Sequence, residues 1–203
     1  MPFCSICTAA FEALAGLEAA GNIRAWGFSA RSPAEAIAAV TELDAPVVQA
    51  NFNMMDVRAA ESGLLDEARR HEAGLIGRTP LCFGFLSGAI SRDTVFPPGD
   101  HRHGWSMAQL ANWIEGASEL LAAIGADPGT SGAQSALRFC LAFPEISSVI
   151  PGILRPAEAE DNAAASDLGP LPERAVRAVL EINRRRQFFV KPPPAAYTNP
   201  LKD

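Results

Sequence analysis

The sequence predicts an α/β fold with a parallel sheet, and three observations lead to that class. Short apolar runs alternate along the chain with longer segments of helical periodicity, which is the pattern of successive βα units. Gly21, Gly74 and Pro144 fall where helices are expected to stop. The 203 residues are 48% apolar and 20% charged, as in an ordinary globular domain with a buried core.

The individual elements follow from apolar periodicity and from residues that start or stop helices. The expected strands are Ile23–Phe28, Pro46–Asn51, Leu75–Arg78 and Ser147–Ile150. The expected helices are Phe11–Ala20, Pro33–Leu43, Ala59–His71, Ala108–Ile124, Ser131–Phe143, Pro156–Ala165 and Pro172–Arg186. At the second helix, Ser32 is the expected N-cap, Pro33 suits the first turn and Glu35 closes a capping box.

Two features of this arrangement bear on function. The stretch from Thr79 to about Met107 is irregular and rich in Gly, Pro, Phe and Ser, and loops of this length are usually functional or disordered. Four parallel strands cannot close a barrel, because closure in this class takes eight. The array is therefore either an open sheet with two exposed edges or is completed by strands from elsewhere.

Composition excludes several partners. The formal net charge of −6 argues against nucleic acid, which requires a basic surface. No apolar run approaches the ~20 residues of a membrane-spanning helix. The N-terminal segment Met1–Cys4 lacks the basic region of a signal peptide, so a cytoplasmic location is expected.

Metal and thiol chemistry are not favoured. The four cysteines are too few and too scattered for a disulfide scaffold. Cys4 and Cys7 have a C-x-x-C spacing, but no second Cys or His pair lies nearby, and we interpret them as small apolar residues at the start of a helix. His101 and His103 follow a Pro-rich turn and are expected in an exposed loop that offers no further metal ligands.

Tyrosine and lysine are almost absent from the chain. The single tyrosine, Tyr197, and the two lysines, Lys191 and Lys202, all lie in the Pro-rich segment 191–203. We expect that segment to be a disordered tail behind one domain of residues 1–190. A mechanism that needs a buried Tyr or Lys in the folded body is therefore excluded.

Four segments carry a resemblance to the aldo/keto reductase family. Gly21–Ser29 (GNIRAWGFS) resembles the family's GKIRAIGVSN strand, and Val47–Asn53 (VVQANFN) resembles its VVQVEYN strand. Thr79–Gly88 (TPLCFGFLSG) is similar to the PL..G.L.G turn. Ser148–Gly152 (SVIPG), together with Glu160–Asn162 (EDN), resembles the terminal VIPG…EEN signature. Order and spacing also agree, so we expect a member of this family.

The resemblance implies a particular part of the family's fold. It runs from about Phe11 to Leu171 and covers only the C-terminal half of the (β/α)8 barrel. We therefore expect a parallel (β/α) half-barrel that corresponds to the last four strands of a TIM barrel.

The resemblance also implies contacts to a nicotinamide dinucleotide. Ser29 and Gln49 match the residues that hold the nicotinamide carboxamide, although the asparagine that usually follows the serine is Ala30 here. Arg78 stands where an aromatic residue often stacks on the nicotinamide, and a guanidinium plane can also stack. The loop that cradles the pyrophosphate matches Thr79, Leu81 and Gly84, and the pair that contacts the adenine matches Asp161 and Asn162.

One position bears on the choice between NADP and NAD. NADP is the family expectation, because Arg or Gln commonly contacts its 2′-phosphate, but Glu158 stands at that position here. A carboxylate would repel the phosphate, at a cost of about 1 kcal/mol at 4 Å even in bulk water. Arg155, one turn away, offers compensation, and NAD remains possible.

Each of these residues also has a purely structural interpretation. Gln49 would then belong to a polar strand face, Ser29 to a turn, Arg78 to an ion pair with an acid, and Glu158 to a solvated helix face. The cluster of Phe83, Phe85 and Leu86 is expected to serve packing rather than substrate contact.

The resemblance implies NAD(P)H-dependent carbonyl reduction, with Tyr, Lys, Asp and His supplied by the barrel's N-terminal half. The alkoxide left by hydride transfer must be protonated, and Tyr does so only beside a cation that lowers its pKa. Because the chain has no such Tyr or Lys in its body, we expect no carbonyl reductase activity from it alone. Three alternatives stay open: a complementary N-terminal half from a separate chain, a homodimerising nucleotide-binding module, or a truncated gene fragment.

Overall fold

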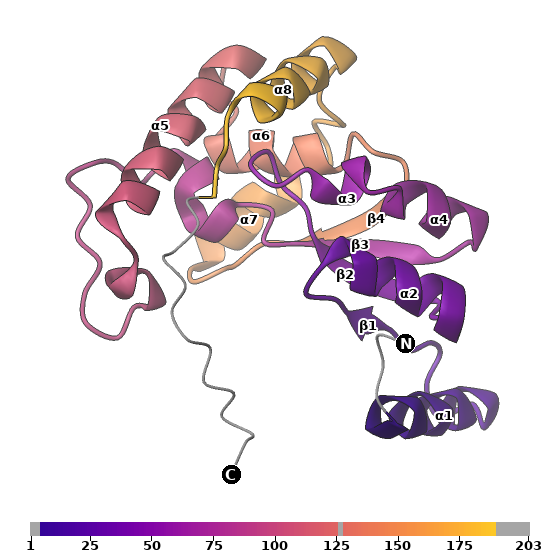
Figure 1. The fold of residues 1–203 in the computed structure, drawn as a ribbon. Helices are drawn as coiled ribbons and strands as arrows, with labels where there is room; N and C mark the ends of the chain where they lie inside the picture. Colours follow the sequence, from indigo (N-terminus) through magenta and orange to yellow (C-terminus); the bar gives the residue numbers. More distant parts are fainter. Residues whose placement is uncertain (1–4, 126–127, 190–203) are drawn as a thin grey trace.

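The computed structural model of the chain describes residues 5–125 and 128–189, and Figure 1 shows their arrangement. Within them four parallel strands form one sheet in the order β1-β2-β3-β4. The strands are β1 (Phe28–Ser29), β2 (Val47–Asn51), β3 (Gly74–Arg78) and β4 (Ile146–Ile150). The prediction of an α/β fold with a parallel sheet is confirmed.

Helices connect these strands on the described part of the chain. They are α1 (Ser5–Ala19), α2 (Pro33–Leu43), α3 (Arg58–Glu61), α4 (Leu64–Arg70), α5 (Met107–Ile124), α6 (Gly132–Cys140), α7 (Pro156–Ala164) and α8 (Glu173–Arg185). Two short 3-10 helices, η1 (Cys82–Ser87) and η2 (His101–Gly104), lie in the stretch predicted to be irregular. In Figure 1, α2, α3 and α4 group on one side of the sheet, and α5 packs along α8.

The first strand differs most from its prediction. We expected it over Ile23–Phe28, but the ladder holds only Phe28 and Ser29, which pair with Val48 and Gln49 of β2. By this register Gly27 lies opposite Val47, and Trp26 lies opposite Pro46, which has no N–H to donate, so the ladder cannot extend over the whole predicted run. The sequence pattern identifies the apolar run that contains β1, but it does not show how that run is aligned with the neighbouring strand β2.

The helix predicted over Ala59–His71 is two helices, α3 and α4. Gly63 separates them with a φ of +86°, a left-handed conformation that glycine adopts without a side-chain clash. The start of α2 follows its prediction in part. Ser32 accepts a hydrogen bond from the Glu35 N–H at 3.2 Å, but the Glu35 carboxylate accepts from the N–H of Arg31 instead of closing the capping box.

The two faces of the sheet have different surroundings. Side chains that alternate along the central strands, including Val48, Ala50 and Leu75, are buried in the core. The opposite face carries polar and half-buried residues and is hollowed by a cavity of about 330 Å³ that is open to solvent. This hollow is lined by Ala25, Trp26, Gly27, Phe28, Ser29, Val47, Gln49 and Ile76.

The described residues were also compared with the predictions about membrane spans, metal sites and thiols. Within the described ranges, no helix is both long and apolar enough to cross a bilayer. No group of three or more His, Cys, Asp or Glu side chains there could hold a metal ion. Burial raises the pKa of Cys82 to about 12 and also raises that of Cys140, so both thiols stay protonated at neutral pH. Cys4 and the tail 191–203 lie outside the described residues.

Candidate functional site

The polar side chains predicted to bind a cofactor gather where the strands end. Ser29, Gln49 and Arg78 come from β1, β2 and β3, and Thr79, Leu81 and Gly84 follow directly in the turn after β3. Parallel sheets bind ligands at the carboxyl ends of their strands, because the turns and helix N-termini meet there. Six of the nine predicted cofactor residues therefore share one edge of the sheet.

Ser29 and Gln49 form a hydrogen-bonded pair. The Gln49 Nε2 donates to Ser29 Oγ at 2.8 Å, and the backbone ties the strands at the same level, since Ala30 N–H donates to the Gln49 carbonyl at 2.8 Å. Ser29 is exposed and Gln49 is half-buried in the hollow. Among the described residues, no partner accepts from the Ser29 hydroxyl or donates to the Gln49 side-chain oxygen. The pair thus offers one donor and one acceptor, which is the complement of a primary carboxamide.

Arg78 crosses the end of the sheet toward β1. Its Nη2 donates to the carbonyl of Ala30 at 3.0 Å, while its Nε is buried without a hydrogen-bond partner. None of the described carboxylates forms an ion pair with Arg78, so the predicted alternative of a structural pair with an acid finds no support among them. A buried donor without a partner is costly, and a ligand at this edge would relieve that cost.

The turn after β3 has an unusual backbone. Thr79, Cys82 and Phe83 have φ values of +58°, +45° and +57°, which are uncommon for residues with a side chain, and Gly84 follows at +93°. Each such residue costs of order 1–3 kcal/mol and persists only where its surroundings hold it, often at binding sites. Leu81 precedes η1 and is half-buried, and its carbonyl accepts from the N–H of Gly84 at 3.0 Å.

Two asparagines that the sequence analysis did not single out hold this turn. The Thr79 hydroxyl donates to Asn51 Oδ1 at 3.1 Å, and Asn53 Nδ2 donates to the Thr79 carbonyl at 3.0 Å. The Asn53 oxygen in turn accepts from Met55 N–H at 2.8 Å. Both asparagines lie in the segment Val47–Asn53, which resembles a strand of the family. That resemblance was the signal in the sequence that could have identified them.

Arg102 fixes the far side of the same turn and was also missed. Its Nη1 donates to the Phe83 carbonyl at 2.9 Å, and its other nitrogens hold Asp100 at 2.9 and 2.7 Å. These bonds to Arg102 keep the pKa of Asp100 well below its usual range. The guanidinium also lies 4.4 Å from the centre of the Phe96 ring.

The aromatic cluster of this loop packs as predicted, with one exception. Phe85 and Leu86 are buried in the core. Phe83 is 40% exposed, although its ring stacks on Trp113 with centroids 5.7 Å apart and meets the edge of Trp105 at 5.0 Å.

The residues predicted for the adenine end lie on α7. Asp161 joins α7 to α6, because its carboxylate accepts from the Ser131 hydroxyl at 2.7 Å and its carbonyl accepts from Gln134 Nε2 at 3.0 Å. The remaining candidate of the pair, Asn162, is half-buried. Asp161 therefore has a structural role in this fold whether or not it contacts a ligand.

Arg155 and Glu158 form an ion pair at the start of α7. Arg155 Nε and Nη2 donate to the Glu158 carboxylate at 3.0 and 2.7 Å, and the N–H of Leu154 donates to its second oxygen at 2.8 Å. The Leu154 N–H and the Arg155 guanidinium lower the pKa of Glu158, so the carboxylate is charged at neutral pH. Arg155 was predicted to offset the repulsion between Glu158 and a 2′-phosphate, but here its guanidinium is paired with Glu158 itself.

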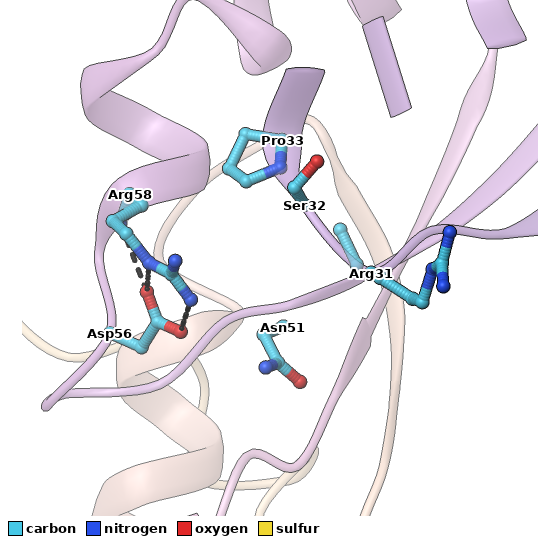
Figure 2. Close-up of a pocket in the computed structure, with 7 residues that line it drawn as sticks. Arg31, Ser32, Pro33, Asn51, Asp56 and Arg58 are labelled. Carbon is cyan, nitrogen blue, oxygen red and sulfur yellow. Dashed lines mark hydrogen bonds and ion pairs between the residues drawn. The ribbon is translucent and has the colours of Figure 1, made fainter. Parts of the chain in front are cut away.

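A second, smaller cavity lies beside the site and is shown in Figure 2. The buried carboxylate of Asp56 accepts two hydrogen bonds of 2.7 Å from the Arg58 guanidinium, while the Arg31 side chain points away from this pair. The cavity of about 10 Å³ has room for roughly one water molecule. Asp56 and Arg58 are paired with each other, Arg31 pairs with Glu35, and the Asn51 oxygen accepts from Thr79, so we assign the cavity a structural role.

The fold and the site together define a class of protein. A parallel sheet connected by helices, with polar side chains and a constrained turn at the strands' carboxyl ends, is typical of α/β proteins that carry their sites at this end of the sheet. The sequence model of the aldo/keto reductase family matches residues 4–184. The chain belongs to the aldo/keto reductase family, as the sequence resemblance predicted.

Curated relatives carry two kinds of description. The chain is 32% identical over 158 residues to an Arabidopsis thaliana protein named "Probable voltage-gated potassium channel subunit beta", with 72% of this chain and 48% of the relative covered. It is 30% identical over 122 residues to the L-glyceraldehyde 3-phosphate reductase of Escherichia coli, with 58% and 35% covered. The chain spans about half the length of the first of these relatives.

Solved structures agree with the family. The glycerol dehydrogenase of Gluconobacter oxydans superposes with a TM-score of 0.70 at 26% identity, over 91% of this chain and 56% of that one. The holo form of an aldo-keto reductase from Bacillus halodurans gives 0.63 at 19% identity, over 85% and 54%, and shows the likeness of fold alone. The four-stranded sheet is consistent with part of an aldo-keto reductase barrel.

Proposed function

We propose that this chain binds a nicotinamide dinucleotide and forms the cofactor-binding part of an NAD(P)H-dependent aldo/keto reductase. The observation that carries the proposal is the pairing of Ser29 with Gln49 beside Arg78 at the carboxyl end of the sheet. The pair presents a donor and an acceptor to a carboxamide, and the buried Arg78 Nε offers a donor to a ligand.

The rest of the cofactor would follow the turn after β3 and reach α7. Cys82, Phe83 and Gly84 take positive φ values, and turns of this kind present backbone N–H groups to anions. The N–H groups of Cys82 and Gly84 donate to the carbonyls of Thr79 and Leu81, so other N–H groups of the turn would meet the phosphates. This supports a pyrophosphate at Thr79, Leu81 and Gly84. The adenine would then lie toward Asp161 and Asn162, next to the Arg155–Glu158 pair.

The chemistry divides between the cofactor and the protein. When bound, the nicotinamide supplies hydride to a carbonyl carbon. Ser29 and Gln49 would orient the ring through its carboxamide, and the constrained turn would hold the phosphates. The described residues include no tyrosine or lysine to protonate the product alkoxide. We therefore propose that the described part alone does not complete a reduction, and that other groups provide the proton.

We further propose that the four strands are the last four of an eight-stranded barrel. The open hollow supports this, because it leaves Ser29, Gln49 and Ile76, which lie level with one another on β1, β2 and β3, on an uncovered sheet face. In a closed barrel that face would be interior. The same hollow supports the second candidate, a non-catalytic nucleotide-binding module in which another copy of this chain covers the face. A purified chain that is monomeric by light scattering at micromolar concentration would contradict the second candidate.

The first test removes the carboxamide partner. Gln49→Leu should weaken NADPH or NADH binding about tenfold or more, because an apolar side chain of similar size offers no hydrogen bond to the amide. Titration by cofactor fluorescence or calorimetry measures the affinity. Gln187→Leu, at an exposed position outside the site, is the matched control and should bind as the unmodified protein does. An unmodified chain that binds neither cofactor would refute the proposed function.

A second test addresses the choice of cofactor. Glu158→Gln should raise the affinity for NADPH relative to NADH about fivefold, because it removes a charge that repels the 2′-phosphate and releases Arg155 to meet that phosphate. The amide can still accept the Leu154 N–H, so the start of α7 is kept. Glu160→Gln on the same helix is the control and should leave the ratio of the two affinities unchanged. If both variants give the same ratio as the unmodified chain, Glu158 does not face the 2′ position.

A further inference from the structure

Arg78 carries a positive charge that nothing in the described site neutralises. Its hydrogen bond goes to a backbone carbonyl, that of Ala30, and its Nε is buried without a partner. The acids that follow β1 and β2 in the chain pair with other residues, since Asp56 is held by Arg58 and Glu35 by Arg31. The carboxyl edge of the sheet therefore holds an uncompensated cation at Arg78.

This cation lies directly beside the Ser29–Gln49 pair. Arg78 Nη2 contacts the carbonyl of Ala30 at 3.0 Å, Ala30 follows Ser29 in the chain, and the Ala30 N–H donates to the Gln49 carbonyl at 2.8 Å. Arg78 thus contacts the residue that directly follows the Ser29–Gln49 pair in the chain. We expect a ring that is hydrogen-bonded to Ser29 and Gln49 through a carboxamide to lie near the guanidinium of Arg78.

We propose that Arg78 makes this site select the redox state of its cofactor, favouring the reduced nicotinamide over the oxidised one. The inference rests on the proposed function. The oxidised nicotinamide ring is a cation, whereas the dihydronicotinamide ring is neutral. Repulsion from Arg78 therefore weakens binding of the oxidised form alone. The phosphates are common to both forms, so their attraction to Arg78 cancels in the ratio of the two dissociation constants.

The size of the effect follows from the separation and the surrounding medium. Two unit charges roughly 5 Å apart repel enough to change affinity about fourfold in bulk water, and more strongly where burial lowers the dielectric constant. Because part of Arg78 is buried, we expect the reduced cofactor to bind about tenfold more tightly than the oxidised one. A guanidinium plane can also stack on the ring, but stacking alone does not predict that the reduced form binds more tightly than the oxidised form.

The test compares the affinities of NADPH and NADP+ for the full chain and for two variants. Arg78→Gln removes the charge and should bring the ratio of dissociation constants close to one. Arg78→Lys keeps the charge without the planar group and should retain most of the preference. Raising the salt concentration from about 0.05 M to about 0.5 M should screen the charge of Arg78. The preference of the unmodified chain for NADPH over NADP+ should therefore decrease. Circular dichroism confirms that the variants are folded.

The outcomes separate the inference from the proposed function. Binding of both forms with equal affinity by the unmodified chain would overturn the inference and leave cofactor binding intact. A preference that persists unchanged in Arg78→Gln would also overturn it, because the charge would then not be the cause. Failure of the unmodified chain to bind either form would overturn the proposed function and the inference together. If Arg78→Gln does not fold, the unmodified ratio and its salt dependence still decide the question.

Discussion

Replacing Phe52 with alanine should lower the free energy of unfolding by about 3–5 kcal/mol, the usual loss for a large aromatic side chain in a packed core. Phe52 is fully buried. Its ring stacks on Phe139 with centroids 5.8 Å apart and meets the edge of Phe143 at 4.9 Å. Its carbonyl also accepts from the Cys140 thiol at 3.3 Å. The substitution removes the centre of a cluster that joins the end of β2 to α6.

The loss would be a large part of the whole stability. Single domains unfold with about 5–15 kcal/mol, so Phe52→Ala should leave a clearly measurable unfolded population in mild denaturant. Denaturant titration followed by circular dichroism measures the change. Leu154→Ala is the control, because that side chain is 91% exposed and its truncation should change stability by less than about 0.5 kcal/mol. A loss below about 1 kcal/mol at Phe52 would mean that the cluster is not part of the core.

Three of the four strands could be predicted from sequence. β2, β3 and β4 begin and end within one residue of the predicted bounds, although β4 lies at an edge of the sheet. β1, at the other edge, is shorter than its apolar run, and the start of its ladder depends on its register with β2. That boundary is a property of strand register, which local apolar patterning does not encode.

The candidate site shows the same division between local and tertiary information. Ser29, Gln49 and Arg78 could be identified because they lie in recognisable segments. Their contacts could not, because strand register brings Gln49 to Ser29 across twenty residues of sequence. Arg102 and Asn53 were missed for a further reason. Their side chains donate to backbone carbonyls 19 and 26 residues away in the chain. Because every residue has a backbone carbonyl, the sequence does not indicate which one a side chain will contact.

The second large effect is expected at Asn53, whose side chain links the core to the candidate site. It is 2% exposed, donates to the Thr79 carbonyl at 3.0 Å and accepts from the Met55 N–H at 2.8 Å. Asn53→Ala leaves the Met55 N–H without a partner in a buried setting, while the Thr79 carbonyl keeps only the Cys82 N–H. The free energy of unfolding should therefore fall by about 1–3 kcal/mol. Denaturant titration measures the loss, and the exposed Asn22→Ala is the control.

The same change should weaken cofactor binding, because Asn53 holds Thr79 in its positive φ of +58°. Without that bond the turn can relax toward an unstrained conformation and move Leu81 and Gly84 away from the positions proposed for the pyrophosphate. A Thr79→Gly background separates the two effects, since glycine adopts this φ without strain. In that background Asn53→Ala should cost less stability than in the unmodified chain. Strictly additive losses would show that Asn53 satisfies buried groups but does not restrain the turn.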